Sequence, residues 1–114
     1  NIRVVECRLA AVLLAKSSGA AWSDVLTLGD ALKLLKLTLA QGYRAVEENV
    51  PSLPLSFAAA AAAVGVDLDT LLGHLIKDRR SLFSAATLES LKLEPHKRAL
   101  HVYSEAARVE EFRA

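Results

Sequence analysis

The sequence predicts an all-α fold. Apolar residues recur at three- and four-residue steps through most of the chain, which is the spacing of one helix face. Side chains that suit a helix N-cap precede several of these apolar stretches, and glycine or proline follows several of them. No stretch alternates polar and apolar residues, as a half-buried strand does, over more than a few positions. These observations together favour several short helices.

The first predicted element is a helix from Ile2 to Ala15. Its apolar face consists of residues three or four positions apart, namely Ile2, Val5, Leu9, Val12 and Leu13. Gly19 ends the helix, because glycine takes the left-handed conformation that closes a helix C-terminus without steric cost. A loop that contains Trp22 follows.

Two short helices come next, and each begins with the signature of a capping box. Thr27 is followed by Asp30, and Thr38 by Gln41, so that a hydroxyl and a second acceptor can satisfy the free N–H groups of each first turn. The two helices are expected over Leu28–Lys36 and Leu39–Asn49. Because a tight turn joins them, they are expected to form an αα-hairpin.

A second helical pair is expected after a break at Pro51 and Pro54, each of which removes a backbone donor. Ser56 can cap the first helix, which contains the alanine run Ala58–Ala63, and Asp67 can cap the second. These helices are expected over Phe57–Val64 and Leu68–Lys77, again as an αα-hairpin.

The stretch Ser81–Lys92 carries only a weak helical pattern and is interpreted as partly helical. The last helix is expected from Pro95 to the end of the chain, since proline is tolerated in a first turn. Its apolar face comprises Ala99, Val102, Tyr103, Ala106 and Val109. If its partners lie in a part of the protein outside these residues, Val102, Ala106 and Val109 are exposed.

Composition fits one domain over residues 1–114 and offers no general surface for nucleic acid. The chain is 53% hydrophobic and 24% charged, with a net charge of +1. The clusters Lys77–Arg80 and His96–Arg98 are interpreted as solvated helix ends and not as a nucleic-acid surface. No membrane span or signal peptide is expected. A single cysteine, Cys7, favours a reducing compartment, by default the cytosol, and is interpreted as a small buried hydrophobe.

The residue types that carry chemistry do not form a recognisable site. His74, His96 and His101 lack the spacing of metal ligands, and the five glycines are too scattered for a phosphate-binding loop. The last helix offers ion pairs of Arg98 with Glu105 and of Glu105 with Arg108. We therefore expect no catalytic, cofactor-binding or metal-binding residue in this chain.

Two stretches resemble the galactokinase and N-acetylgalactosamine kinase family. Asn1–Ala11 (NIRVVECRLAA) resembles the segment after the family's second conserved motif, and His101–Val109 (HVYSEAARV) resembles a later helix. Weaker similarity runs between them in register, through Trp22, Val25–Leu28, Val64–Leu68 and Arg98-Ala99. The sequence departs from the family pattern at Pro51–Ala63 and Ser81–Pro95.

The resemblance implies an internal helical segment of a larger α+β sugar kinase of the galactokinase, homoserine kinase, mevalonate kinase and phosphomevalonate kinase (GHMP) superfamily. Such an enzyme uses ATP and Mg²⁺ to phosphorylate the anomeric hydroxyl of galactose or N-acetylgalactosamine. The family's catalytic aspartate and its phosphate loop would lie upstream, a sugar-holding tyrosine just before Asn1, and a third motif beyond Ala114. Both ends are therefore expected to be cuts, and the segment alone is expected to be inactive.

The role that the resemblance leaves for this segment is support, with Ile2–Ala15 packed behind the sugar pocket and the remainder of the kinase chain as its partner. Two alternatives stay open. One is a catalytically silent, galactose-responsive regulator of the same family, which a disrupted upstream phosphate loop would indicate. The other is an autonomous helical interaction module, which requires the segment to fold alone. The residues do not specify the sugar.

Overall fold

The computed structural model describes residues 2–76 and 91–113, the last four of these by their backbone alone. Within this part of the chain the all-α prediction is confirmed, with six α-helices and one short 3₁₀ helix, η1. They are α1 (Ile2–Ser17), η1 (Trp22–Asp24), α2 (Leu28–Leu35), α3 (Leu39–Asn49), α4 (Phe57–Val64), α5 (Leu68–Leu75) and α7 (Pro95–Arg113).

The predicted N-caps are formed. The capping boxes of α2 and α3 are each closed by two reciprocal hydrogen bonds. The threonine hydroxyl accepts a hydrogen bond from the backbone N–H of the residue three positions later, which is Asp30 or Gln41. The side chain of that residue accepts a hydrogen bond from the backbone N–H of the threonine. Ser56 and Asp67 each accept a hydrogen bond from the backbone N–H three residues further on. These bonds are local, and sequence spacing alone is sufficient to predict them.

Helix ends account for most differences from the predicted bounds. The helices α3 and α4 have the bounds expected, whereas α1 continues two residues further, to Ser17. The helix α2 stops at Leu35 because Lys36 takes the left-handed conformation, with φ 57°. At Ile76 the backbone is extended and α5 has ended. Lys77 and most of the Ser81–Lys92 stretch lie outside the described residues.

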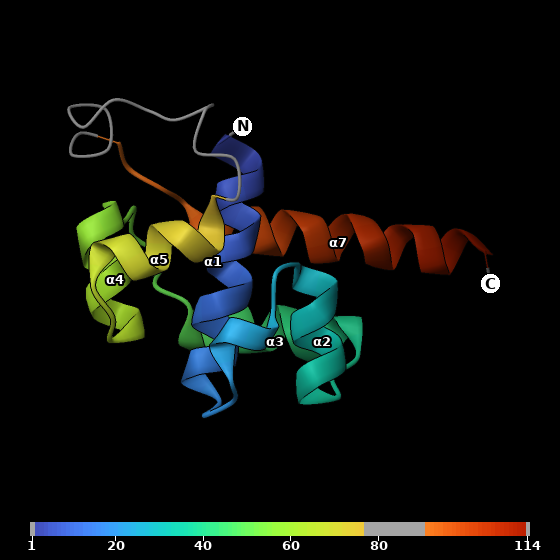
Figure 1. Cartoon of the computed structure of the whole chain (residues 1–114). Coiled ribbons are helices and arrows are strands. Elements are labelled where there is room, and N and C mark those ends of the chain that lie inside the picture. The colour runs from blue at the N-terminus through green and yellow to red at the C-terminus, as the bar shows by residue number, and fades with distance from the viewer. Residues whose placement is uncertain (1, 77–90, 114) are drawn as a thin grey trace.

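Figure 1 shows α1 at the centre of the molecule, with α2 and α3 on one side and α4 and α5 on the other. The helix α1 contacts each of the other described helices. The chain bends by 98° between α4 and α5. The last helix, α7, packs on α3 and α1, and its C-terminal end extends beyond the other helices (Figure 1).

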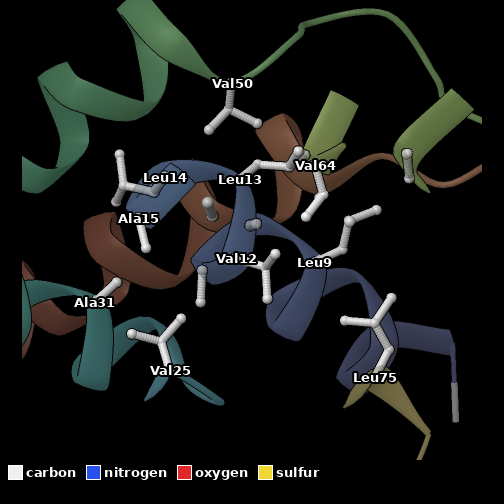
Figure 2. Packing of buried hydrophobic residues seen from close by; sticks show 14 of the residues in the cluster. Leu9, Val12, Leu13, Leu14, Ala15, Val25, Ala31, Val50, Val64 and Leu75 are labelled. Carbon is white, nitrogen blue, oxygen red and sulfur yellow. The ribbon is translucent and has the colours of Figure 1, made fainter. Parts of the chain in front are cut away.

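The core is built around residues 9–15 of α1, all of which are buried (Figure 2). The predicted one-sided apolar face is therefore too narrow, because alanines fill the positions between the leucines and valines and allow neighbouring helices to approach closely. The fully enclosed residues are Leu9, Ala10, Ala11, Val12, Leu13, Leu14 and Ala15. A helix that is apolar all round is an internal helix of the fold.

The face of α7 changes in burial along its length. Ala99 and Tyr103 are buried, Val102 and Ala106 are half-buried, and Val109 is 50% exposed. The Tyr103 hydroxyl donates a hydrogen bond to the Leu28 carbonyl (2.9 Å), which fixes α7 against the start of α2. The start of α7 is therefore firmly held, whereas the residues further along it are less enclosed by the described elements.

An antiparallel bridge between Leu55 and Leu93 was not predicted. Their backbone N–H groups donate to each other's carbonyls, at 2.8 and 2.7 Å, and so join the segment before α4 to the segment before α7. Among the described helices, none is long and apolar enough by itself to cross a bilayer, and only the bent α4–α5 pair passes that test when taken together.

Candidate functional site

Two of the three histidines hold backbone carbonyls. His74 Nε2 lies 2.6 Å from the Val25 carbonyl oxygen, and His96 Nδ1 lies 2.8 Å from that of Val50. Because a carbonyl oxygen only accepts, these ring nitrogens must carry the proton and donate it. The His74 ring also meets Trp22 edge-on, with ring centroids 5.2 Å apart. Both imidazoles are therefore engaged in holding loops against the helices.

No candidate metal centre emerges from the part of the chain that the structure describes. No three His, Cys, Asp or Glu side chains gather there closely enough to hold an ion. His101, the third histidine, is exposed on α7. The described histidines act as hydrogen-bond donors to the main chain or face solvent, and they are not grouped as ligands.

Glu6 is a buried carboxylate that the sequence analysis did not single out. It is 7% exposed, its Oε2 accepts from the Glu94 backbone N–H at 2.7 Å, and its Oε1 lies 3.7 Å from Arg98 Nε. Glu94 directly precedes α7, so Glu6 caps that helix from the surface of α1. Arg98, for which sequence spacing suggested Glu105, is placed against Glu6 instead. The predicted pair of Glu105 with Arg108 is present at 3.3 Å.

One signal in the sequence does point to Glu6. It lies on the same side of α1 as Ile2, Val5 and Leu9, and an acidic residue on an apolar face is rare unless it has a partner. The partner itself cannot be found by local spacing, because 88 residues separate Glu6 from Glu94.

Cys7 lies next to this cluster and is half-buried. Burial raises the pKa of the Cys7 thiol, the nearby Arg98 charge lowers it, and Glu6 raises it again, with burial the largest effect. A raised pKa keeps the thiol protonated at neutral pH, whereas a nucleophilic cysteine requires a thiolate. This environment supports a structural role for Cys7.

The basic residues at the start of α7 do not form a continuous cationic surface. His96 points to the Val50 carbonyl, Arg98 to Glu6, and Lys97 to solvent. The other basic cluster, Lys77–Arg80, lies outside the described residues. The geometry of 96–98 gives no support to a nucleic-acid interface there.

One concave surface, which we call the α1–α2 groove, has a volume of about 390 Å³. It lies between the first two turns of α1, the start of α2 and one side chain of α7. Its lining residues are Arg3, Val4, Cys7, Arg8, Leu26, Thr27, Leu28, Gly29 and Val102. Arg8 Nη1 also donates to the Leu75 carbonyl at the end of α5 (2.8 Å). The groove is apolar in the main and carries its positive charge on α1.

A second groove, of about 400 Å³, lies between α3 and α7. Its walls include Tyr43 and Tyr103, and Arg44 and Glu47 contribute opposite charges to it. Neither groove is lined by a histidine.

Comparison with known proteins finds a similarity that covers nearly the whole chain. A galactokinase of Dictyostelium discoideum is 36% identical over 112 residues, which is 98% of this chain and 21% of that protein. The chain thus spans about a fifth of the length of that curated relative. No protein-family profile matches the chain. The similarity relates these helices to one part of a galactokinase.

Proposed function

We propose that these 114 residues are the helical supporting part of a galactokinase-like enzyme that transfers the γ-phosphate of Mg-ATP to the anomeric hydroxyl of galactose or N-acetylgalactosamine. The observation that carries this proposal is the 36% identity to a galactokinase over 98% of the chain. A match of that extent includes the loops as well as the core helices, so a shared all-α composition does not account for it.

The geometry is consistent with a structural role, because several of the potentially reactive side chains among the described residues make contacts that stabilise the fold. His74 and His96 bind main-chain carbonyls, Glu6 caps α7, and the Cys7 thiol stays protonated. On this proposal, the groups that bind ATP, Mg²⁺ and the sugar belong to other parts of a longer polypeptide, which is the partner of this segment. A cytosolic location is part of the same proposal.

The helix α1 is the element best suited to hold neighbouring parts of the polypeptide in position. Its second half is locked in the core from Leu9 to Ala15, whereas its first two turns reach the surface. A rigid helix held in this way fixes the position of residues that directly precede it, where the family resemblance places a sugar-holding tyrosine. Misplacing a reactant by about 1 Å can cost about 100-fold in rate, so such anchoring has a catalytic consequence.

The proposal is tested with the full-length polypeptide that the gene encodes. Purified protein is incubated with Mg-ATP and either galactose or N-acetylgalactosamine, and the sugar 1-phosphate is detected by ³¹P NMR. We expect ATP-dependent formation of one of the two products. Sugar binding without turnover would identify the silent regulator instead, and the absence of both would refute the galactokinase-like function.

A further inference from the structure

The groove between α3 and α7, which we call the α3–α7 groove, has two helical walls. One side of α3 forms the first wall over about two turns, or about 12 Å. Its residues are Leu39, Ala40, Tyr43, Arg44 and Glu47. Tyr103, Ser104 and Ala107 form the second wall on α7, which continues to Arg113 and extends beyond the other described helices (Figure 1). A groove between two helices has the shape that a third helix fills.

The α3–α7 groove combines apolar residues with charges of both signs. Tyr43 and Ala107 are half-buried, and Tyr103 is buried. Arg44 and Glu47 are exposed, and their side chains make no hydrogen bond or ion pair in the part of the chain that the structure describes. Tyrosine and arginine are enriched where proteins dock. The surface is therefore complementary to an amphipathic helix that carries an acidic and a basic side chain.

We propose that the α3–α7 groove is the docking site for an amphipathic helix of the same longer polypeptide. This helix packs apolar side chains on Tyr43 and Ala107, and brings an acidic group to Arg44 and a basic group to Glu47. The inference rests on the proposed function, because it takes the chain to be part of a larger kinase. The matched stretch is 21% of the galactokinase relative, so most of such a polypeptide is left to supply the helix. An occupant in the same polypeptide has a high effective concentration and needs only modest contacts.

The shape of the groove disfavours a second copy of the same surface as the occupant. Across a two-fold axis, the two grooves would face each other. Two concave surfaces in that arrangement enclose a void, and the side chains that line a void lose packing contacts. A single helix laid between α3 and α7 fills the space and leaves no such void.

Coverage of the groove is measured by thiol labelling of Ala40→Cys in the full-length polypeptide, with Ala58→Cys as the matched control. Each alanine is exposed and is the second residue of a capped helix, so the helix N-terminus affects both thiols alike. Only Ala40 lines the groove. Rates of reaction with a maleimide are read on the labelled peptides by mass spectrometry.

With the docked helix in place, Ala40→Cys should react at least about tenfold more slowly than Ala58→Cys, since labelling then requires local opening. Equal rates would overturn the proposal. Protection of Ala40→Cys that appears only as the protein concentration rises would also overturn it, in favour of a second copy.

The charge on the docked helix is tested by Glu47→Lys, with Glu48→Lys as its control. Both glutamates are exposed in the last turn of α3, where the helix dipole favours a cation, and both are one turn from Arg44. Glu47 lines the groove and Glu48 does not. The effects that arise within α3 are therefore alike for the two variants, and only Glu47→Lys would place a cation against the basic group of the docked helix.

Both variants are made in the full-length polypeptide and melted at low salt and in 1 M NaCl. We expect Glu47→Lys to melt about 2 °C or more below Glu48→Lys at low salt, and the difference to shrink at high salt. Equal melting temperatures, or a higher value for Glu47→Lys, would overturn the basic group on the docked helix.

These readouts do not depend on catalytic turnover. An inactive full-length protein with a protected Ala40→Cys would remove the proposed kinase activity and leave the docking site standing. An active kinase in which Ala40→Cys and Ala58→Cys react equally fast would do the reverse. The two proposals can therefore fail independently.

Discussion

Five long-range hydrogen bonds between side chains and main-chain groups join the described elements of this chain. Each connects a helix to a loop or to the end of another helix, and so joins elements that are far apart in the sequence. The donors and acceptors are Glu6 with the Glu94 N–H, Arg8 with the Leu75 carbonyl, His74 with Val25, His96 with Val50, and Tyr103 with Leu28. These bonds specify how the helices are joined.

Glu6 is the member of this set whose loss should cost most. Glu6→Ala leaves the Glu94 N–H without its acceptor and the half-buried Arg98 without its countercharge, so we expect the free energy of unfolding to fall by about 2–3 kcal/mol. Glu6→Gln keeps an acceptor for Glu94 but removes the countercharge of Arg98, and we expect a loss of about 1 kcal/mol. Denaturant unfolding of the full-length protein measures both. Equal losses for the two variants would contradict this role of the charge.

Gly42 and Gly29 form a matched pair of helical glycines in opposite environments. A Cβ at Gly42 would collide with the Leu32 side chain and come within 3.2 Å of the Tyr103 ring. The Tyr103 ring cannot easily move away, because the Tyr103 hydroxyl is hydrogen-bonded to the Leu28 carbonyl. We expect Gly42→Ala to destabilise by about 1–2 kcal/mol despite the better helix propensity of alanine. Gly29→Ala has room and should be neutral or stabilising. Thermal melting compares them, and a stable Gly42→Ala would show that α3 and α7 are less closely packed.

Sequence could predict the residues whose partners are three or four positions away, and little beyond them. Spacing predicts Thr27 and Thr38 as caps because their acceptors and donors lie in the same turn, and both caps are formed. Arg98 was matched with Glu105 for the same reason, yet its partner is Glu6 in another helix. A local pattern holds no information about which distant element supplies the opposite charge.

At the scale of elements, too, features that depend on local contacts are predicted from the sequence, and features that depend on distant contacts are not. The bounds of α3 and α4 follow from caps and propensity. The early end of α2 arises at Lys36, where a lysine adopts the left-handed conformation that glycine usually takes. The bridge between Leu55 and Leu93 depends on two irregular segments meeting in space, for which neither segment carries a signal.

The two capping boxes differ in one respect that pH can detect. Hydrogen bonds from the Thr27 and Leu26 N–H groups lower the pKa of Asp30 below its ordinary 3.8, whereas Gln41 does not titrate. A lowered folded-state pKa means that the stabilisation is present above 3.8 and is lost as the pH falls through the folded value. We expect Asp30→Asn to weaken the dependence of unfolding free energy on pH between about 5 and 2.

The Thr38 box supplies the control for that prediction. Gln41→Glu places a titrating carboxylate in the same geometry and should add acid sensitivity, so the two variants should change the pH dependence in opposite directions. Chemical denaturation at a series of pH values measures it. An unchanged profile for both variants would show that the boxes contribute nothing through charge.

At the scale of the whole molecule, α1 is the axis on which the other described helices assemble (Figure 1). The all-α class followed from periodicity, but the central position of α1 did not. Five apolar positions indicated a one-sided helix, and only the assembled fold shows that alanines complete its enclosure. The α1–α2 groove could not be predicted from the sequence either, because α1, α2 and α7 each contribute to it from distant parts of the sequence.

The central claim is that this helical unit supports a sugar kinase without taking part in its chemistry. It is tested most directly by Val5→Asp in the full-length polypeptide, since Val5 is buried in α1 close to the position that the claim says α1 fixes. Leu53→Asp, at a position that is 75% exposed, is the control. Melting temperature and galactose affinity are measured on the same preparations.

The account predicts that Val5→Asp lowers the unfolding free energy by about 3 kcal/mol, because an unpaired charge is buried in an apolar interface, while the protein that remains folded binds sugar normally. Leu53→Asp should change neither quantity. A Val5→Asp protein that melts at the wild-type temperature but no longer binds sugar would contradict the supporting role.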